Sequence, residues 1–594
     1  MEKKLISDLA LPIVKDDWIN FCAHKISDPK LIWFNSTDID TLNFSELSLE
    51  DIKKRFLQEN AYAIASNGSF QNVLFDENDK KLLEAERYGG TGIGFNGGGG
   101  RCGNTDKFQL KGVGANGLVG EGSDNLHSYG GLDASAAIIE TINSYVFGKV
   151  LPLGVVKVHG LIWVEESAGF DITKNESCWG VLMVRDQCVR PAHLMRTANF
   201  KPKSESKAIG INDVARVRRI NKKLSASLGE HNKFIMALGK FLQNQANQFG
   251  FARAARIMNG VISPSNCTFD GRWIDLNSCS MIDGGVNYSI NSQFYTEHEA
   301  PLSYAIELLH SYGKYNNVYL NPEPLINYYR EQFFTYFQHH ISYVMGFSSQ
   351  LSQQTSDEWK AIALCFYRVI HSGKAVVTDR AKFNSNDPVS ALIKGLYLSL
   401  FSNQAAALEY DTAGIIDDSE KDALSTHFKI LIENMFTQHK SIKDSGSDSL
   451  SQFIVTSFIC AMKRACYSAI FYLPLLEGQV RKFCRDSKPV EIEKFINTYC
   501  DTANWIYERQ ESNIILFQSS HLTINMETQQ QVYSIFSNND HHIFKSYTLL
   551  MNFLHEELGG KLLICGFNGV YFFGSLLNIL EYVYNDKEML KVTV

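Results

Sequence analysis

The chain has 594 residues, of which 45% are hydrophobic and 20% are charged, and this composition indicates a soluble globular protein with a substantial core. The formal net charge is −7 and the pI is about 6.2, which excludes a broad basic face for duplex nucleic acid, so we expect no nucleic-acid partner. The 12 cysteines have neither C-x-x-C nor zinc-finger spacing, and we therefore expect reduced thiols and a cytoplasmic location.

The N-terminal residues 1–85 are mixed in pattern. Residues 43–60 combine a serine that can cap a helix with helical periodicity, and they predict a helix. Asn67-Gly68 is a dipeptide typical of hairpin turns. We expect this stretch to form a mixed N-terminal segment ahead of the main domain.

Glycine then concentrates in residues 86–130, where two glycine-rich loops flank a strand-like segment, residues 107–114. Gly98, Gly100 and Arg101 belong to the first loop, and Glu121 and Gly122 belong to the second. Glycine-rich loops let backbone N–H groups approach a phosphate closely, which favours a nucleotide site. The alternative is a flexible surface loop.

Lys111 lies on the strand between the two glycine-rich loops, and the following helix is predicted to begin near Asp133. A lysine in this place can hold nucleotide phosphates, with a glutamate from the next helix as its ion-pair partner. Glu140, in the middle of that helix, is the predicted partner. The alternative for Lys111 is a solvated residue of an ordinary strand.

Two strands rich in Val, Ile and Trp are predicted at residues 154–166 and 178–190, and a helix is predicted at residues 221–250. Arg185 and Arg190 lie five residues apart near the end of the second strand. Guanidinium groups suit phosphate oxygens, although salt bridges to surface carboxylates would use the same residues.

Asn266 precedes Asp275 by nine residues, and Asp283 follows eight residues later. An asparagine and an aspartate can hold Mg²⁺ together with phosphate oxygens and water. Asp270-Gly271 between them predicts a hairpin turn. The alternative is that these residues are ordinary polar turn formers.

From about residue 296 onward the chain is mostly helical by pattern. The segment Leu562–Leu580 has 19 residues without a charge, which is near the length of a membrane span. Because it also holds three glycines, two asparagines and a serine, we interpret it as a buried hairpin or core helix and expect no membrane contact.

The order of elements predicts an α+β fold with a small β-rich lobe that carries the lysine and a larger helical lobe. This layout resembles a protein-kinase-like bilobal fold with a helical C-terminal extension. We expect an N-terminal mixed segment at residues 1–85, a nucleotide-binding core at residues 86–300 and a mostly helical region at residues 301–594.

The glycine and lysine motifs resemble those of the selenoprotein O (SelO/YdiU) family of kinase-like protein adenylyltransferases. YGGTGIG (88–94) is similar to the family's Y-A-G-H-Q-F-G, and GGGR (98–101) is similar to G-D-G-R. QLKGVG (109–114) is similar to the Q-L-K-G-A-G that bears the family's phosphate-binding lysine. GEG (120–122) resembles a later G-D-G.

The resemblance extends to the second half of the expected core. VLMVRDQCVR (181–190) resembles the family's strand with two arginines, with the arginines two residues closer together. Asn266 and Asp275 match the family's metal segment, H-G-V-M-N-T-D-N followed by I-D-Y-G, without a gap. The resemblance covers roughly residues 85–310.

The resemblance implies that the chain binds ATP with Mg²⁺ or Mn²⁺ and transfers AMP to Ser, Thr or Tyr hydroxyls of a protein substrate. It implies that Asn266 and Asp275 hold the metal. It also supports the catalytic role predicted for Lys111 and Glu140. The residues implied to contact the nucleotide are Gly98, Gly100, Arg101, Lys111, Glu121, Gly122, Arg185, Arg190 and Asp275.

The chain departs from the family at two positions. Ser265 occupies the place of the aspartate that acts as the family's catalytic base, and Asn259 replaces a histidine. A serine does not accept a proton at neutral pH as a carboxylate does, and base catalysis contributes about 10²–10⁴-fold. We therefore expect slow or altered transfer. The alternatives are a nucleotide-binding pseudokinase scaffold and an ATP-dependent protein kinase on the same fold.

Overall fold

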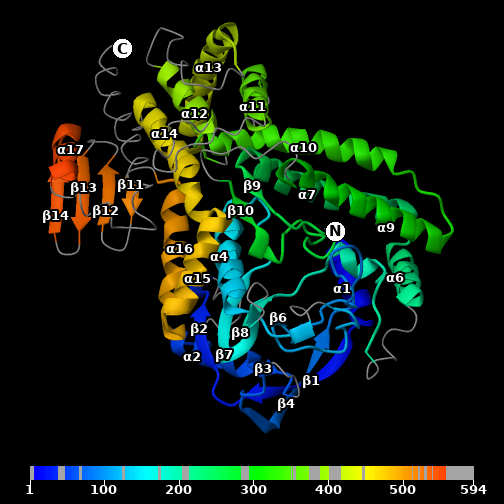
Figure 1. Ribbon diagram of the computed structural model, residues 1–594. Coiled ribbons are helices and arrows are strands. Elements are labelled where there is room, and N and C mark those ends of the chain that lie inside the picture. Colours follow the sequence, from blue (N-terminus) through cyan, green and yellow to red (C-terminus); the bar gives the residue numbers. More distant parts are fainter. Residues whose placement is uncertain are drawn as a thin grey trace.

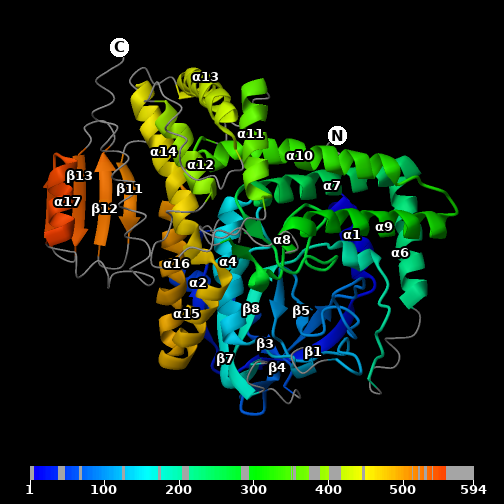
Figure 2. The same ribbon diagram turned by 45° about the horizontal axis from the view of Figure 1, so that its top comes forward.

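The computed structural model has the predicted α+β architecture, with an antiparallel sheet region and a larger helical region (Figure 1). Helices α7 (His231–Ala254), α9 (Ala300–Asn316) and α10 (Glu323–Val344) lie on one side of the sheet region (Figures 1 and 2). Helices α15 (Leu473–Asp486) and α16 (Ile492–Tyr507) lie beside α4 (Ala134–Val150) (Figure 1). The structure describes residues 6–37, 47–65, 70–123, 128–171, 176–203, 213–282, 293–348, 351, 356–372, 388–400, 416–443, 449–510, 513–518, 522–527, 532–537 and 540–556.

The main sheet has eight antiparallel strands in the order β2-β7-β8-β6-β5-β4-β1-β3. The long hairpin of β7 and β8 and the short β6 confirm the strands expected in this part of the sequence. The strands are β1 Ile19–Ile26, β2 Lys30–Phe34, β3 Tyr62–Ala63, β4 Phe75–Ala85, β5 Cys102–Asn104, β6 Phe108–Lys111, β7 Val158–Asp171 and β8 Glu176–Asp186.

This sheet runs across the expected boundary between residues 85 and 86. Strand β4 ends at Ala85 and pairs with β5 through Glu84 and Asn104. The N-terminal strands β1 to β4 therefore form one half of the sheet whose other half carries Lys111. The N-terminal segment and the glycine-rich region share one hydrogen-bonded layer.

The two faces of the central strands pack against different helices, because side chains alternate along a strand. Phe108 and Leu110 of β6 face a hydrophobic cluster that includes Phe56 of α2 (Leu49–Asn60). Gln109 and Lys111 lie on the opposite face, toward α4 (Ala134–Val150). Both faces of β6 are buried, and this places the ammonium of Lys111 inside the protein.

Helix α4 is the central helix of the molecule and begins as predicted. The Asp133 side chain caps it by accepting the N–H groups of Ser135 and Ala136. Helices α15 and α16 pack against α4 from outside (Figure 1), and most α4 side chains are buried. Glu140 therefore sits at the centre of a helix that is covered on most of its surface.

The helical region agrees with the predicted pattern, with one break. The helix expected at residues 221–250 is two helices, α6 and α7, separated at Gly229, whose φ of +77° ends α6. The other helices are α1 Ile6–Lys15, α6 Asp213–Leu228, α7 His231–Ala254, α8 Gln293–Thr296, α9 Ala300–Asn316, α10 Glu323–Val344, α11 Asp357–Ile370, α12 Pro388–Ser399, α13 Asp418–Lys443, α14 Leu450–Tyr467, α15 Leu473–Asp486, α16 Ile492–Tyr507 and α17 Tyr547–Glu556.

A separate four-stranded sheet lies in the region that we expected to be mostly helical. Four antiparallel strands pack in sequence order, and the first lies against α14 and α16 (Figure 2). In β12 every second side chain is buried, which is the period-two pattern of a strand. The strands are β11 Asn513–Gln518, β12 Leu522–Glu527, β13 Val532–Ser537 and β14 Asp540–Phe544.

One helical stretch in the described part of the chain, Leu450–Phe471, has the length and apolar composition of a membrane span. Most of it is buried inside the protein, as in the core helix of a soluble fold. The uncharged segment Leu562–Leu580 and the Asn67-Gly68 turn lie outside the described residues.

Candidate nucleotide and metal site

A cavity of about 310 Å³ lies between the first glycine-rich loop, the end of β6 and the segment from Val261 to Ser278. Its volume is at the lower end of the range for small-molecule sites, which is about 300–1,000 Å³. Several residues predicted from sequence line it together, although they are far apart in the chain. They are Gly98, Gly100, Arg101, Lys111, Arg185, Ser265, Asn266 and Asp275.

The predicted ion pair between Lys111 and Glu140 is present, and it extends to Asp275. Lys111 Nζ lies 2.7 Å from Glu140 Oε2 and 2.6 Å from Asp275 Oδ1. Arg185 Nη1 contacts the same two carboxylates, each at 2.7 Å. Two cations and two carboxylates thus form a closed square at the inner wall of the cavity.

The sheet register places Arg185 in this square. Gln109 of β6 pairs with Arg185 of β8, and Gln109 Oε1 accepts a hydrogen bond of 2.8 Å from Arg185 Nε. Lys111 lies two residues further along β6 and therefore on the same face. Arg185 and Glu140 are almost fully buried, with 1% and 3% of their surfaces exposed.

Asp275 has two features typical of a functional carboxylate. Its backbone is in the left-handed region, with φ 60° and ψ 57°, which costs about 1 kcal/mol or more for a residue other than glycine. Burial opposes its ionisation, but the charges of Arg185, Lys111 and Arg190 outweigh this and hold the pKa of Asp275 well below its usual range. Its side chain is 23% exposed, so the carboxylate still reaches the cavity.

Helix α4 also fixes the backbone that follows Asp275. Asn143, three residues after Glu140, donates hydrogen bonds of 2.8 and 3.1 Å to the carbonyls of Leu276 and Cys279. These carbonyls belong to the short helix η5 (Leu276–Ser278) and the residue after it. One helix therefore positions both Glu140 and the Asp275 segment.

Arg190 approaches the site from a buried network that sequence reasoning missed. Its Nη1 donates to the Ser265 carbonyl at 2.9 Å and lies 3.5 Å from Asp275 Oδ2. Its Nη2 lies 3.6 Å from Glu86, which is fully buried. Burial opposes ionisation of Glu86, but His193, Arg190 and Arg185 lower its pKa to about 2. Glu86 therefore balances the charge of Arg190.

Asn266 and Ser265 line the cavity together with residues of the first glycine-rich loop. Asn266 Nδ2 donates to the Val261 carbonyl at 2.7 Å, and its Oδ1 accepts a hydrogen bond of 3.3 Å from Ser265 Oγ. Ile274 N–H donates to the Asn266 carbonyl at 3.1 Å, and Cys267 pairs with Trp273. The predicted turn at Asp270-Gly271 is thus present, and it brings Asn266 next to Asp275.

The first glycine-rich loop forms one wall of the cavity and contributes one cationic side chain. Few of its backbone N–H groups are free to bind a ligand. The N–H groups of Gly97, Gly99 and Gly100 donate to the carbonyls of Leu118, Glu86 and Gly98. Arg101 lines the cavity, and its guanidinium has no hydrogen-bond or ion-pair partner in the part of the chain that the structure describes. Side-chain cations therefore dominate the electrostatics here.

Three of the predicted nucleotide contacts do not line the cavity. One of them is Arg190, which is buried and reaches the site through the Ser265 carbonyl and through Asp275 Oδ2 at 3.5 Å. The other two are Glu121 and Gly122, which are exposed. Glu121 N–H donates to the Lys201 carbonyl at 2.7 Å, and Gly122 lies against the ring of Phe95. This pairing with the segment after β8 turns the second glycine-rich loop outward. Asp283 lies outside the described residues.

Gly98→Ala is expected to destabilise the protein by about 3 kcal/mol and to weaken nucleotide binding. Gly98 has a φ of +138°, and a Cβ there would lie 2.2 Å from the Glu86 carbonyl and 2.8 Å from the Tyr88 amide. Gly94→Ala in the same loop is the control, because a Cβ at Gly94 meets nothing within 4 Å. Urea unfolding of both variants measures the effect, and equal losses would exclude the close packing at Gly98 as the cause.

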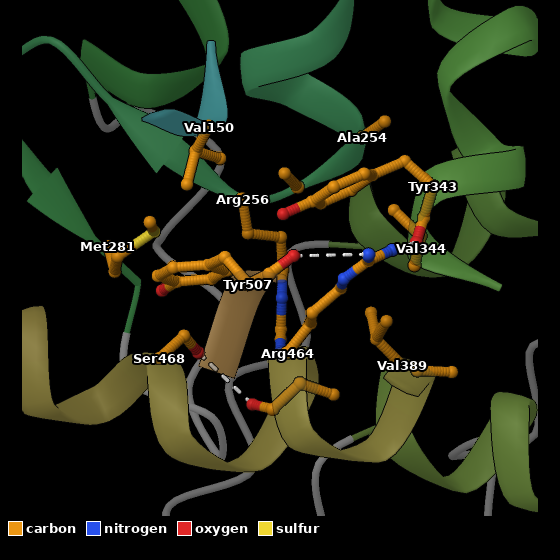
Figure 3. Close-up of a pocket in the computed structure, with 13 residues that line it drawn as sticks. Val150, Ala254, Arg256, Met281, Tyr343, Val344, Val389, Arg464, Ser468 and Tyr507 are labelled. Carbon is orange, nitrogen blue, oxygen red and sulfur yellow. Dashed lines mark hydrogen bonds between the residues drawn. The ribbon is translucent and has the colours of Figure 1, made fainter. Parts of the chain in front are cut away.

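A second, smaller cavity of about 40 Å³ lies between α7, α10, α14 and α16 (Figure 3). Arg464 crosses it, donates to the carbonyls of Tyr343 and Tyr507, and stacks on the Tyr343 ring at 3.8 Å from its centroid. The buried hydroxyls of Tyr343 and Tyr507 have no hydrogen-bond partner among the described residues. A space of this size and polarity suits a few water molecules and is too small for a nucleotide.

The side-chain oxygens of the larger cavity can bind a hard cation such as Mg²⁺ only if phosphate or water oxygens complete its coordination. Asn266 Oδ1 and Asp275 Oδ2 are the oxygen atoms available from the predicted metal pair. In the described ranges no three His, Cys, Asp or Glu side chains gather in metal-binding geometry. Mg²⁺ commonly uses one or two protein ligands together with phosphate oxygens and water, and the two residues fit that pattern.

No protein-family model matches the chain, and no curated protein matches its sequence. The site must therefore be interpreted from its own geometry and charge.

Proposed function

We propose that this chain binds ATP with Mg²⁺ or Mn²⁺ and transfers AMP to Ser, Thr or Tyr hydroxyls of a protein substrate. The observation that carries the proposal is the ion-pair cluster of Lys111, Glu140 and Asp275, from three separate elements, of which Lys111 and Asp275 line the cavity. A strand lysine held by a helix glutamate next to a metal-binding aspartate is the arrangement that positions nucleotide phosphates in kinase-like enzymes.

On this proposal the eight-stranded sheet with α4 acts as the small lobe of a protein-kinase-like fold. The segment from α7 onward acts as the large helical lobe. The cavity lies where these two parts meet, which is the place expected for a nucleotide bound between lobes. The protein would act in the cytoplasm.

The side chains have distinct roles in the proposed reaction. Lys111, Arg185 and Arg101 bind phosphate oxygens, and Arg190 holds the Ser265 backbone in place. The acceptor hydroxyl forms a bond to the α-phosphorus while the bond to the β-phosphate oxygen breaks, so pyrophosphate leaves and the hydroxyl proton passes to water. When bound, the metal ion supplies charge neutralisation of the phosphates, with Asn266 and Asp275 as its protein ligands.

Ser265 favours a second candidate, a nucleotide-binding scaffold with weak or no transfer. Its hydroxyl bonds to Ser263 Oγ at 2.9 Å and to Asn266, and it replaces the carboxylate expected of a base. Positioning and electrostatic stabilisation still support slow transfer without a base. The same cavity would also serve a γ-phosphate transfer, which is the third candidate.

ATP labelled separately on the α- and γ-phosphates distinguishes the three candidates. With Mn²⁺ and a mixture of cytoplasmic proteins, we expect label from the α-phosphate on protein and none from the γ-phosphate. Label from the γ-phosphate alone would indicate a kinase. Nucleotide binding without either label would indicate the scaffold, and no binding at all would refute the nucleotide site.

A further inference from the structure

The loop that carries Asn266 is held at its start by a buried carboxylate outside the cavity. Glu297, on the short helix η6 (Glu297–Glu299), accepts the N–H of Asn259 through Oε1 at 2.9 Å and the N–H of Gly260 through Oε2 at 3.0 Å. Both carboxylate oxygens therefore bind successive backbone amides of the loop. A neutral amide side chain has one carbonyl oxygen and cannot accept both N–H groups in this way.

Gly260 presses this loop onto the segment that follows Asp275. Its φ is +85°, and a Cβ there would lie 2.4 Å from the Ser278 carbonyl. Ser278 belongs to η5, whose preceding residue is Asp275. The two backbone N–H hydrogen bonds to Glu297 thus hold the Asn266 loop against the backbone that follows Asp275, the second proposed metal ligand.

A short chain of contacts leads from Gly260 to the amide of Asn266. The next residue, Val261, accepts the 2.7 Å hydrogen bond from Asn266 Nδ2. Because the nitrogen end of the amide is fixed by the Val261 carbonyl, the Oδ1 end is directed to the Ser265 hydroxyl, from which it accepts a hydrogen bond, and both residues line the cavity. Displacing residues 259–261 would therefore rotate or release the Asn266 ligand atom.

Burying the carboxylate of Glu297 costs free energy, so we expect a loop to be fixed in this way only where the position of the loop matters. The side chain is 4% exposed, and burial raises its pKa to about 7, with Arg253 of α7 as the nearby cation that opposes this. In some proteins, buried ionisable groups of this kind serve to hold a specific geometry. The geometry held here is that of the cation site.

We infer that Glu297 is a positioning residue: by binding the amides of Asn259 and Gly260 it sets the Asn266 carbonyl oxygen for the metal ion. This inference rests on the proposed function. Outer partners that orient metal ligands typically change metal affinity by about 10–100-fold when they are removed. Glu297 would act on the metal without touching the nucleotide.

The test measures binding of α,β-methylene ATP to the full chain, once with EDTA and once as a function of Mn²⁺ concentration. For Glu297→Gln we expect the half-saturating Mn²⁺ concentration to rise about tenfold or more, while nucleotide affinity in EDTA stays unchanged. Glu299→Gln is the control, because Glu299 lies on the same short helix with a 41% exposed side chain and pairs with Arg330.

Three outcomes would overturn the positioning role of Glu297. An unchanged Mn²⁺ requirement in Glu297→Gln would overturn the inference, as would equal losses in EDTA and in Mn²⁺, which indicate a general folding defect. In an Asn266→Ala background we expect Glu297→Gln to have no further effect on the Mn²⁺ requirement, and an additive effect would also overturn it.

If Glu297→Gln lowers the folded fraction, Glu297→Asp keeps the charge with a shorter reach. For that variant we expect a smaller rise in the Mn²⁺ requirement, and no rise in the folded protein would overturn the inference. If the wild-type protein itself binds no nucleotide in either condition, the proposed function fails first, and that result is distinct from a defect confined to the variants.

Discussion

Asp275→Asn is expected to abolish metal-dependent transfer, with a loss of about 10³-fold or more, because it removes the carboxylate of the proposed metal pair. Asparagine has nearly the same shape and tolerates the left-handed backbone at this position, so the fold should persist. The loss should be visible as the disappearance of α-phosphate label from protein at saturating Mn²⁺.

Although Asp275→Asn should lose transfer activity, we expect it to bind the nucleotide more tightly when no metal is present. Lys111, Arg185 and Arg190 all lie near the Asp275 carboxylate, which neutralises part of their charge. When that carboxylate becomes a neutral amide, the three cations are left to attract phosphate. We therefore expect α,β-methylene ATP to bind Asp275→Asn more tightly than the wild type in EDTA, by about tenfold for a change of one charge at close range.

Asp270→Asn is the matched control for this experiment. Asp270 lies on the same turn but pairs with Arg272 outside the cavity. It should leave both transfer and nucleotide affinity near the wild-type values. Undiminished transfer in Asp275→Asn would remove Asp275 from the metal site, and weaker binding in EDTA would contradict the charge balance that we derive from the ion pairs.

Arg185→Leu is expected to lower the free energy of unfolding by about 3–5 kcal/mol, because it removes a cation that the buried Glu140 shares with the partly buried Asp275. Arg185 lies 2.7 Å from both Glu140 and Asp275 and is 1% exposed. Leucine fills much of the volume, so the cost is chiefly electrostatic: Lys111 is left to balance both Glu140 and Asp275, with Arg190 close only to Asp275. Urea unfolding at neutral pH measures it, and nucleotide binding should fall as well.

Arg272→Leu is the control for the stability measurement. Arg272 also contacts two carboxylates, Asp186 and Asp270, each at 2.9 Å, but its side chain is 24% exposed. Solvent screening limits the expected loss there to about 1 kcal/mol. Equal losses in the two variants would mean that burial does not amplify the charge cluster. Arg185→Lys should lie between them, because lysine keeps the charge and loses the forked geometry.

Much of the candidate site could be predicted because its chemistry is local in the sequence. Lys111 lies in a short strand between glycine-rich loops, and Asp133 marks the start of the helix that carries Glu140. Asn266 and Asp275 are joined by a turn with its own dipeptide signal. Each of these features has a pattern within about 30 residues, and the ion pair and the shared cavity follow once the elements pack.

The side chains that hold the site in place are not marked by any local sequence pattern. Glu86, Gln109 and Asn143 are single polar residues in the sequence, and Glu297 lies near the start of the helical region. Each gains its role from partners far along the chain, such as the pairing of Gln109 with Arg185 set by the register of β6 and β8. Charge compensation of this kind depends on which strands become neighbours.

The sequence also did not predict the four-stranded sheet or the outward position of Glu121 and Gly122. Strands β11 to β14 are short, and except in β12 their apolar and polar residues do not alternate regularly. The sequence alone determined the α+β class, the lysine–glutamate pair and the Asn266–Asp275 turn, because short-range periodicity, capping and turn chemistry specify them. Only the tertiary structure decided which loop lines the cavity and which buried groups balance its charge, because those depend on packing and register between distant segments.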